Sequence, residues 1–129
     1  MLLQLLMYTF VIQKKIVLSN NNAHKLVGTG PPVVFCSAIN GRVPYFMYSN
    51  FINCLKNNMT VVLPNTKEMM PETIEEISKV LNVQKVGFIS HSMVNPDILT
   101  SEYIEKAVCI DPLSLPHISF PFQIETTSI

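Results

Sequence analysis

The sequence has few charged side chains and no excess of either sign. Charged residues make up 14% of its 129 positions, and nine Lys and Arg side chains balance nine Asp and Glu. Proteins that bind nucleic acid through its phosphates carry a positive excess, so the balance argues against that class of partner. The hydrophobic fraction of 48% argues against intrinsic disorder, because it is enough to bury one core.

Long apolar runs are also missing. No stretch of about 18 apolar residues occurs, which a membrane-spanning helix would require. The most apolar segment is 1–12, and Lys14 and Lys15 follow it, whereas a secretory signal has its positive charge in front of the run. We therefore expect a cytoplasmic protein without a transmembrane helix. Association of segment 1–12 with a membrane is the alternative.

The cysteines form none of the spacings that indicate a metal site or a disulfide framework. Cys36, Cys54 and Cys109 are far apart, and no Cys-x-x-Cys motif or Cys/His cluster is present. Each cysteine lies in an apolar segment, which favours buried free thiols. We expect no metal and no cofactor.

The sequence does contain four short apolar runs, each ending in turn-forming or polar residues. They are continuous rather than alternating, as in strands buried on both faces of a parallel sheet, and cover 33–36, 60–63, 86–89 and 107–110. Helical spacing follows Pro44 and Pro71, and a less regular helical segment covers 96–106. This order predicts one α/β domain over 1–129, with a mainly parallel sheet, helices on both faces, a hairpin before it and an irregular Pro-containing tail at 112–129.

One strand end has the pattern of a nucleophile elbow. Ligands bind at the carboxyl ends of the strands in such sheets, and residues 87–94 place Ser92 at a sharp turn there. We expect the turn to raise the Ser92 hydroxyl above the sheet, and a following helix to present the Met93 N–H to a developing oxyanion. The motif needs small residues two places before and after the serine. Ser90 meets this need and Val94 does not.

Four segments in order resemble the α/β-hydrolase family. Residues 28–35, Gly-Thr-Gly-Pro-Pro-Val-Val-Phe, look like the family's Gly-Ser-Gly-Pro-Pro-Val-Val segment before its third strand. Residues 60–64 resemble the fourth strand, 86–92 the fifth strand with its Gly-His-Ser elbow, and 106–112 the sixth strand with its terminal Asp-Pro. The resemblance covers about residues 15–115. It implies an α/β-hydrolase-like fold that is incomplete at the C-terminus.

The resemblance also implies a serine hydrolase of esters or lipids. Ser92 would be the nucleophile, and the backbone N–H groups of Ile39 and Met93 would form the oxyanion hole. The family's acid and base follow its seventh and eighth strands, where we expect no residue of this chain. Asp111 and His117 are the candidates to replace them as acid and base.

The other two histidines are expected to be structural. His91 matches the histidine of the family's Gly-His-Ser, which is not the base, and His24 is expected at the surface. Ser37-Ala38 departs from the family's His-Gly at the first oxyanion segment.

Three interpretations remain open, because a serine without a base is a poor nucleophile. The first is a divergent hydrolase-like domain, a pseudoenzyme with a binding or assembly role. The second is an active esterase- or lipase-like enzyme that acts on a small ester or lipid, with improvised partners for Ser92 or a base from another chain. The third is a half-domain that forms a homodimer, or joins a partner chain, to complete its sheet.

Overall fold

The computed structural model describes residues 13–17, 22–112 and 121–128. Its strands are β1 (Gln13–Val17), β2 (Ala23–Val27), β3 (Pro32–Cys36), β4 (Thr60–Leu63), β5 (Val86–His91), β6 (Ile104–Ile110) and β7 (Gln123–Thr127). The α-helical elements are α2 (Ala38–Gly41), α3 (Ser49–Leu55) and α4 (Pro71–Val80), and the 3₁₀ helices are η1 (Tyr45–Tyr48) and η2 (Pro96–Thr100).

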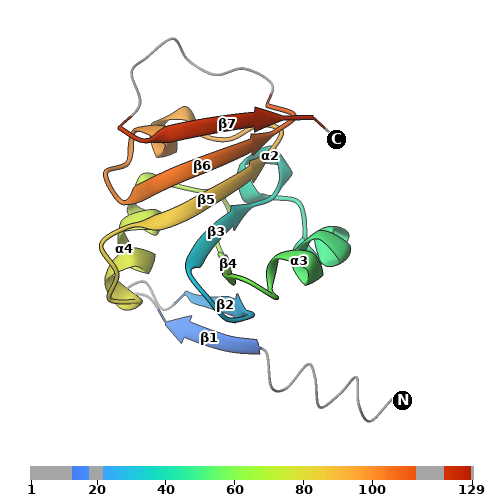
Figure 1. Ribbon diagram of the computed structural model, residues 1–129, viewed down its shortest axis with the longest axis vertical. Coiled ribbons are helices and arrows are strands. Elements are labelled where there is room, and N and C mark those ends of the chain that lie inside the picture. Colours follow the sequence, from blue (N-terminus) through green and yellow to red (C-terminus); the bar gives the residue numbers. More distant parts are fainter. Residues whose placement is uncertain (1–12, 18–21, 113–120, 129) are drawn as a thin grey trace.

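The strands form one mainly parallel sheet in the order β1-β2-β4-β3-β5-β6-β7 (Figure 1). β1 pairs antiparallel with β2, and β2 pairs antiparallel with β4. The pairs from β4 to β7 are all parallel. The predicted α/β class, with an initial hairpin feeding a parallel sheet, is confirmed.

The central strands are apolar on both sides because helices cover both faces of the sheet. Four of the five residues of β3 and three of the four residues of β4 are buried. Figure 1 shows α3 and α4 on opposite sides of the sheet. This arrangement explains why the sequence shows continuous apolar runs rather than alternation.

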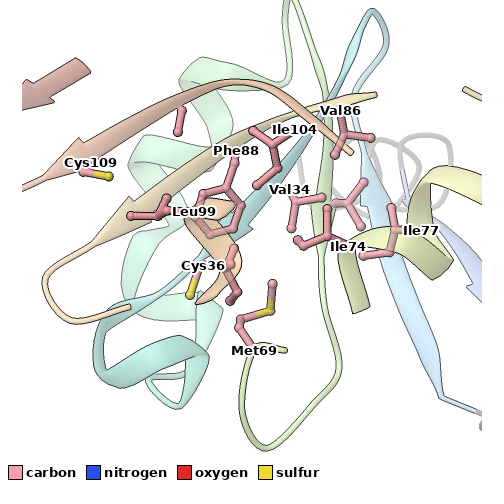
Figure 2. Packing of buried hydrophobic residues seen from close by; sticks show 13 residues of the cluster. Val34, Cys36, Met69, Ile74, Ile77, Val86, Phe88, Leu99, Ile104 and Cys109 are labelled. Carbon is pink, nitrogen blue, oxygen red and sulfur yellow. The ribbon is translucent and has the colours of Figure 1, made fainter. Parts of the chain in front are cut away.

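The face under α4 holds the larger of the two cores. Ile74 and Ile77 of α4 and Leu99 of η2 pack against Val34, Phe88 and their neighbours (Figure 2). Pro71 occupies the first turn of α4, where its missing N–H leaves no bond unmade. The Lys79 ammonium donates to the Glu75 carboxylate one turn away, at 2.8 Å. The helix predicted after Pro71 is therefore present, with its apolar stripe against the sheet.

The opposite face is covered by η1 and α3. Ile52 of α3 packs against Phe35, Val61 and Ile89, and Tyr45 and Tyr48 add their rings to this cluster. The pattern after Pro44 predicts one helix, whereas the structure divides it into a 3₁₀ turn and a seven-residue α-helix.

Two further expectations from the sequence differ from the structure. Only residues 96–100 of the segment 96–106 are helical. The chain then enters β6 at Ile104, whose side chain is fully buried. The tail after residue 112, expected to be irregular, contains β7. The segment Gln-Ile-Glu-Thr-Thr is rich in β-branched residues and largely exposed, as an edge strand can be.

The cysteines are free, as expected, but not all of them are buried. Cys36 and Cys109 lie in the core, and Cys54 is exposed on α3. Its helix presents Ile52 to the core, so a residue two positions further on faces away.

Candidate functional site

Ser92 directly follows β5 and has a backbone that few residues other than glycine adopt. Its φ is +61°, in the left-handed region. The Ser92 N–H donates to the Ile110 carbonyl at 2.9 Å, which fixes the turn against the end of β6. The residue is half-buried at the carboxyl edge of the sheet, where the sequence predicts it.

The helix expected directly after Ser92 is absent. Residues 93–95 have no regular secondary structure, and the next helical turn, η2, begins at Pro96. A residue before proline is kept out of the helical region, and Asn95 has φ −58° and ψ 116°. Val94 turns its side chain against the core. The Met93 N–H therefore does not lie at a helix N-terminus, although it makes no backbone hydrogen bond within the described residues.

The loop after β3 lies against this turn and is also strained. Ile39 and Asn40 have φ values of +56° and +51°, so α2 is a tight turn rather than a regular helix. The Asn40 N–H donates to the Met93 carbonyl at 2.9 Å. This bond brings Ile39, one of the two expected oxyanion donors, to the same part of the molecule as Met93, the other.

Asn40 joins three segments through its side chain and backbone. Its Oδ1 accepts from the Asn95 N–H at 2.9 Å, and its Nδ2 donates to the Met69 carbonyl at 3.1 Å. Its carbonyl accepts from the Met69 N–H at 3.1 Å. Asn40 is not among the site residues predicted from the sequence. Its signal is an asparagine directly before Gly41, since asparagine tolerates left-handed backbone and its amide can both donate and accept.

Tyr48, also absent from the site residues predicted from the sequence, makes a second bridge. Its hydroxyl accepts from the Ala38 N–H at 2.9 Å and lies 2.7 Å from His91 Nδ1. Ala38 precedes Ile39 and His91 precedes Ser92, so the two bridges tie the loop to the turn on both sides of Ser92. No local sequence pattern predicts this contact, because 43 positions separate Tyr48 from His91.

The described histidines are engaged away from Ser92. His91 Nδ1 contacts Tyr48, and His24 Nδ1 accepts from the Asn65 N–H at 2.6 Å. No hydrogen bond of the Ser92 hydroxyl is found within the described residues. His117, the candidate base, lies outside the described residues, and the structure does not test its role.

Asp111, the candidate acid, lies at the same edge of the sheet as Ser92. It directly follows Ile110, whose carbonyl accepts from the Ser92 N–H. Asp111 has φ +47°, and its own N–H donates to the Thr127 carbonyl at 2.7 Å. The backbone at the end of β6 is thus held between the turn at Ser92 and the end of β7.

Two thiols flank β5 directly before this turn. Cys36 on β3 and Cys109 on β6 both stand in register with Ser90. Burial raises the pKa of the Cys36 thiol to about 12 and also raises the pKa of the Cys109 thiol. Both thiols stay protonated near neutral pH and are therefore poor nucleophiles. Ser92 has no competing thiolate in its immediate surroundings.

His24 is fully buried, so the expectation of a surface histidine is wrong. The hairpin is not peripheral, because β2 pairs with β4 inside the sheet. Burial lowers the pKa of His24, and the nearby Glu76 carboxylate opposes that shift. His24 lines a groove of about 900 Å³ between β2, the loop after β4 and α4, together with Arg42, Glu72 and Glu76. Neither Ser92 nor its expected oxyanion donors line this groove.

The described residues contain no metal-binding constellation. His, Cys, Asp and Glu side chains nowhere gather there in threes with the spacing that a metal ion needs. Of the helices in the described ranges, none has both the length and the apolar character for crossing a membrane.

Solved structures with similar folds include α/β-fold hydrolases, epoxide hydrolases and a putative acyltransferase. No protein-family profile matches the chain, and no curated protein matches it significantly. Three of the structural matches have 12–19% sequence identity to this chain. An epoxide hydrolase of the α/β-hydrolase superfamily, from metagenomes of hot environments, matches with a TM-score of 0.60 and 12% identity over 78% of this chain and 42% of its own. An α/β-fold hydrolase from Bacillus anthracis matches with a TM-score of 0.56 and 19% identity over 78% of this chain and 43% of its own.

An epoxide hydrolase from Vigna radiata also matches, with a TM-score of 0.57 and 17% identity over 82% of this chain and 40% of its own. The chain therefore spans about two fifths of the length of these structures. At such identities the matches show the fold and not the activity. The described part of this chain has the fold of the α/β hydrolases.

Proposed function

We propose that this chain carries the nucleophile and the oxyanion donors of a serine hydrolase that acts on a small ester or lipid. The observation that carries the proposal is the backbone of Ser92, at φ +61° where a buried parallel strand ends. A non-glycine residue in that region costs about 1–3 kcal/mol, and such strain clusters at functional sites. The strained turn at Ile39 and Asn40 beside it supports the same interpretation.

The proposed reaction is acyl transfer to Ser92. Its Oγ attacks the ester carbonyl carbon and forms a C–O bond, while the hydroxyl proton passes to a base. The N–H groups of Ile39 and Met93 donate to the oxygen that becomes negatively charged. The intermediate then expels the alcohol, which takes the proton from the base, and water hydrolyses the acyl-enzyme by the same steps.

The base and acid in this proposal are His117 and Asp111, with an imidazole from another chain as the alternative base. We expect slow turnover, because neither residue matches the family's usual positions for acid and base. A serine hydroxyl whose base is poorly placed stays protonated near pH 7, and an oxyanion hole alone supplies a small part of the full rate.

Hydrolysis of a short-chain activated ester tests the proposal. Purified wild-type protein should release the chromophoric alcohol faster than Ser92→Ala, whereas Ser128→Ala, at an exposed serine, should match the wild type. His117→Ala should lower the rate if His117 is the base. Equal rates for the wild type and Ser92→Ala, with both proteins folded by circular dichroism, would refute the proposal.

The second candidate is a non-catalytic interaction module, favoured by the open edges of the sheet. Within residues 13–17, 22–112 and 121–128, β1 and β7 each pair with a single strand, and β7 is largely exposed. An unpaired edge is a template for another strand. This candidate predicts a dimer, or a larger complex with a partner chain, by size-exclusion chromatography with light scattering. A monomer at all concentrations would count against self-pairing.

A further inference from the structure

The Tyr48 hydroxyl lies between the two parts of the candidate site. It is 2.9 Å from the Ala38 nitrogen on the loop after β3, and 2.7 Å from His91 Nδ1 at the end of β5. Ala38 is the residue before Ile39, and His91 is the residue before Ser92. A single oxygen atom therefore links the segment of an expected oxyanion donor to the segment of the nucleophile.

Packing fixes the tyrosine ring from two sides. The ring meets Phe35 edge-on, with centroids 4.9 Å apart and planes at 75°, and it meets His91 in the same way at 5.6 Å. Phe35 is fully buried in β3, so the ring stands on a rigid part of the sheet. The position of the hydroxyl is consequently set by the core rather than by the loops that it joins.

The hydrogen bonds at this oxygen bear on the tautomer of His91. A backbone N–H can only donate, so the Tyr48 oxygen accepts from Ala38. The second lone pair and the proton of the hydroxyl both remain for His91 Nδ1, 2.7 Å away. The arrangement that uses the hydroxyl proton has Tyr48 donating to Nδ1 and the ring proton on Nε2, and this tautomer is part of the inference that follows.

We propose that Tyr48 is a positioning residue for the oxyanion hole, holding the loop of Ile39 against the turn of Ser92. This inference rests on the proposed function. The Ile39 N–H belongs to the peptide that follows Ala38, and the Tyr48 hydroxyl holds the N–H of the peptide before it. The carbonyls of these two peptides accept from the Gly41 N–H at 2.9 Å and the Val43 N–H at 3.2 Å. Loss of the hydroxyl removes one of these three anchors while leaving the ring in the core, and an oxyanion donor displaced from its place loses much of its effect.

The rate of Ser92 phosphonylation by a fluorophosphonate probe measures the effect. Tyr48→Phe should lower the second-order rate by at least about tenfold, because misplaced groups cost that much or more. Tyr45→Phe is the matched control. The Tyr45 hydroxyl donates to the Phe35 carbonyl at 3.3 Å in the same aromatic cluster, and it takes no part in the bridge from Ala38 to His91. This variant should keep the wild-type rate.

Two readouts that do not need a reactive serine separate this inference from the proposed function. Hydrogen exchange at the Ala38 amide should be slow in the wild type and in Tyr45→Phe, and faster in Tyr48→Phe. The ¹⁵N shifts of His91 should show the Nε2–H tautomer in the wild type and a mixture in Tyr48→Phe. If the wild type fails to react with the probe while both readouts behave as stated, the proposed function fails and the Tyr48 bridge stands.

A second pair of variants covers the case in which Tyr48→Phe does not fold. His91→Asn offers an amide oxygen in place of Nδ1 and should keep most of the rate, whereas His91→Ala removes the acceptor and should lower it about as much as Tyr48→Phe. The inference is overturned if folded Tyr48→Phe or His91→Ala reacts at the wild-type rate, or if Ala38 exchange does not respond to loss of the hydroxyl.

Discussion

At the scale of single residues, the site depends on backbone conformations that side chains normally avoid. Ser92, Ile39 and Asn40 all have φ values between +51° and +61°. Hydrogen bonds of Asn40 to Met93 and Asn95 hold the two strained segments together. Strain of this kind persists only where the surrounding structure enforces it.

Replacing Ser92 by glycine should release this strain. Glycine adopts φ +61° without steric cost, so Ser92→Gly should be about 1 kcal/mol more stable than Ser92→Ala in urea unfolding. Ser90→Gly is the control, since Ser90 lies in β5 without a positive φ and should lose about 1 kcal/mol to backbone entropy. A less stable Ser92→Gly would show that the turn is not strained.

His24 should make the stability of the protein depend on pH. Its pKa is lowered in the folded state from the ordinary value of 6.5 because the ring is buried. Below pH 6.5 the unfolded chain therefore takes up a proton that the folded protein resists, and stability falls as the pH drops from 6.5 towards the folded-state pKa. Above pH 6.5 His24 is neutral in both the folded and the unfolded chain, so this loss of stability is absent.

Urea unfolding at pH 5.5 and 7.5 measures this effect. Wild-type protein should lose more stability on acidification than His24→Gln, whose amide oxygen can still accept from the Asn65 N–H. Identical losses in the two proteins would mean that His24 does not resist protonation.

At the scale of elements, glycine and proline decide where strands and helices begin. Gly28 and Gly30 form the turn before β3, with φ values of +91° and +126°. A Cβ at Gly30 would stand 2.3 Å from the Asn58 carbonyl oxygen, so the loop before β4 can approach only because no side chain is present. Pro71 and Pro96 likewise mark the first turns of α4 and η2.

Gly30→Ala should therefore destabilise the protein by more than about 2 kcal/mol, through both the clash and the positive φ. Gly87→Ala is the control within the same sheet. Its Cβ would find its nearest atom, Val33 Cγ2, at 3.4 Å, and its φ is not positive, so the expected change is within about 1 kcal/mol. Thermal or urea unfolding of both variants provides the comparison, and similar losses would contradict the account of this turn.

Strands buried on both faces were predictable from sequence, and elements set by distant contacts were not. The runs at β3, β4, β5 and β6 contain only apolar residues at their centres, which is a local signal. β7 has no such signal, because its polar side chains are exposed and its place depends on pairing with β6. His24 was misplaced for a similar reason, since the pairing of β2 with β4 buries it.

At the scale of the whole molecule, the sheet brings the candidate site together from segments far apart in the sequence. The ends of β3, β5 and β6 supply the loop of Ile39, the turn of Ser92 and Asp111 at a single edge. The positions of Ser92 and Asp111 at strand ends followed from the sequence, since ligands of such sheets bind there. The ties through Asn40 and Tyr48 did not, because they depend on long-range geometry.

The central claim is that Ser92 is an activated nucleophile, and covalent labelling tests it most directly. Folded wild-type protein is incubated with a fluorophosphonate, and intact mass and peptide mapping count and locate the adduct. The account predicts one adduct per chain, on the peptide that contains Ser92, and none in Ser92→Ala. An unlabelled wild-type protein, or an adduct that persists in Ser92→Ala, would contradict it.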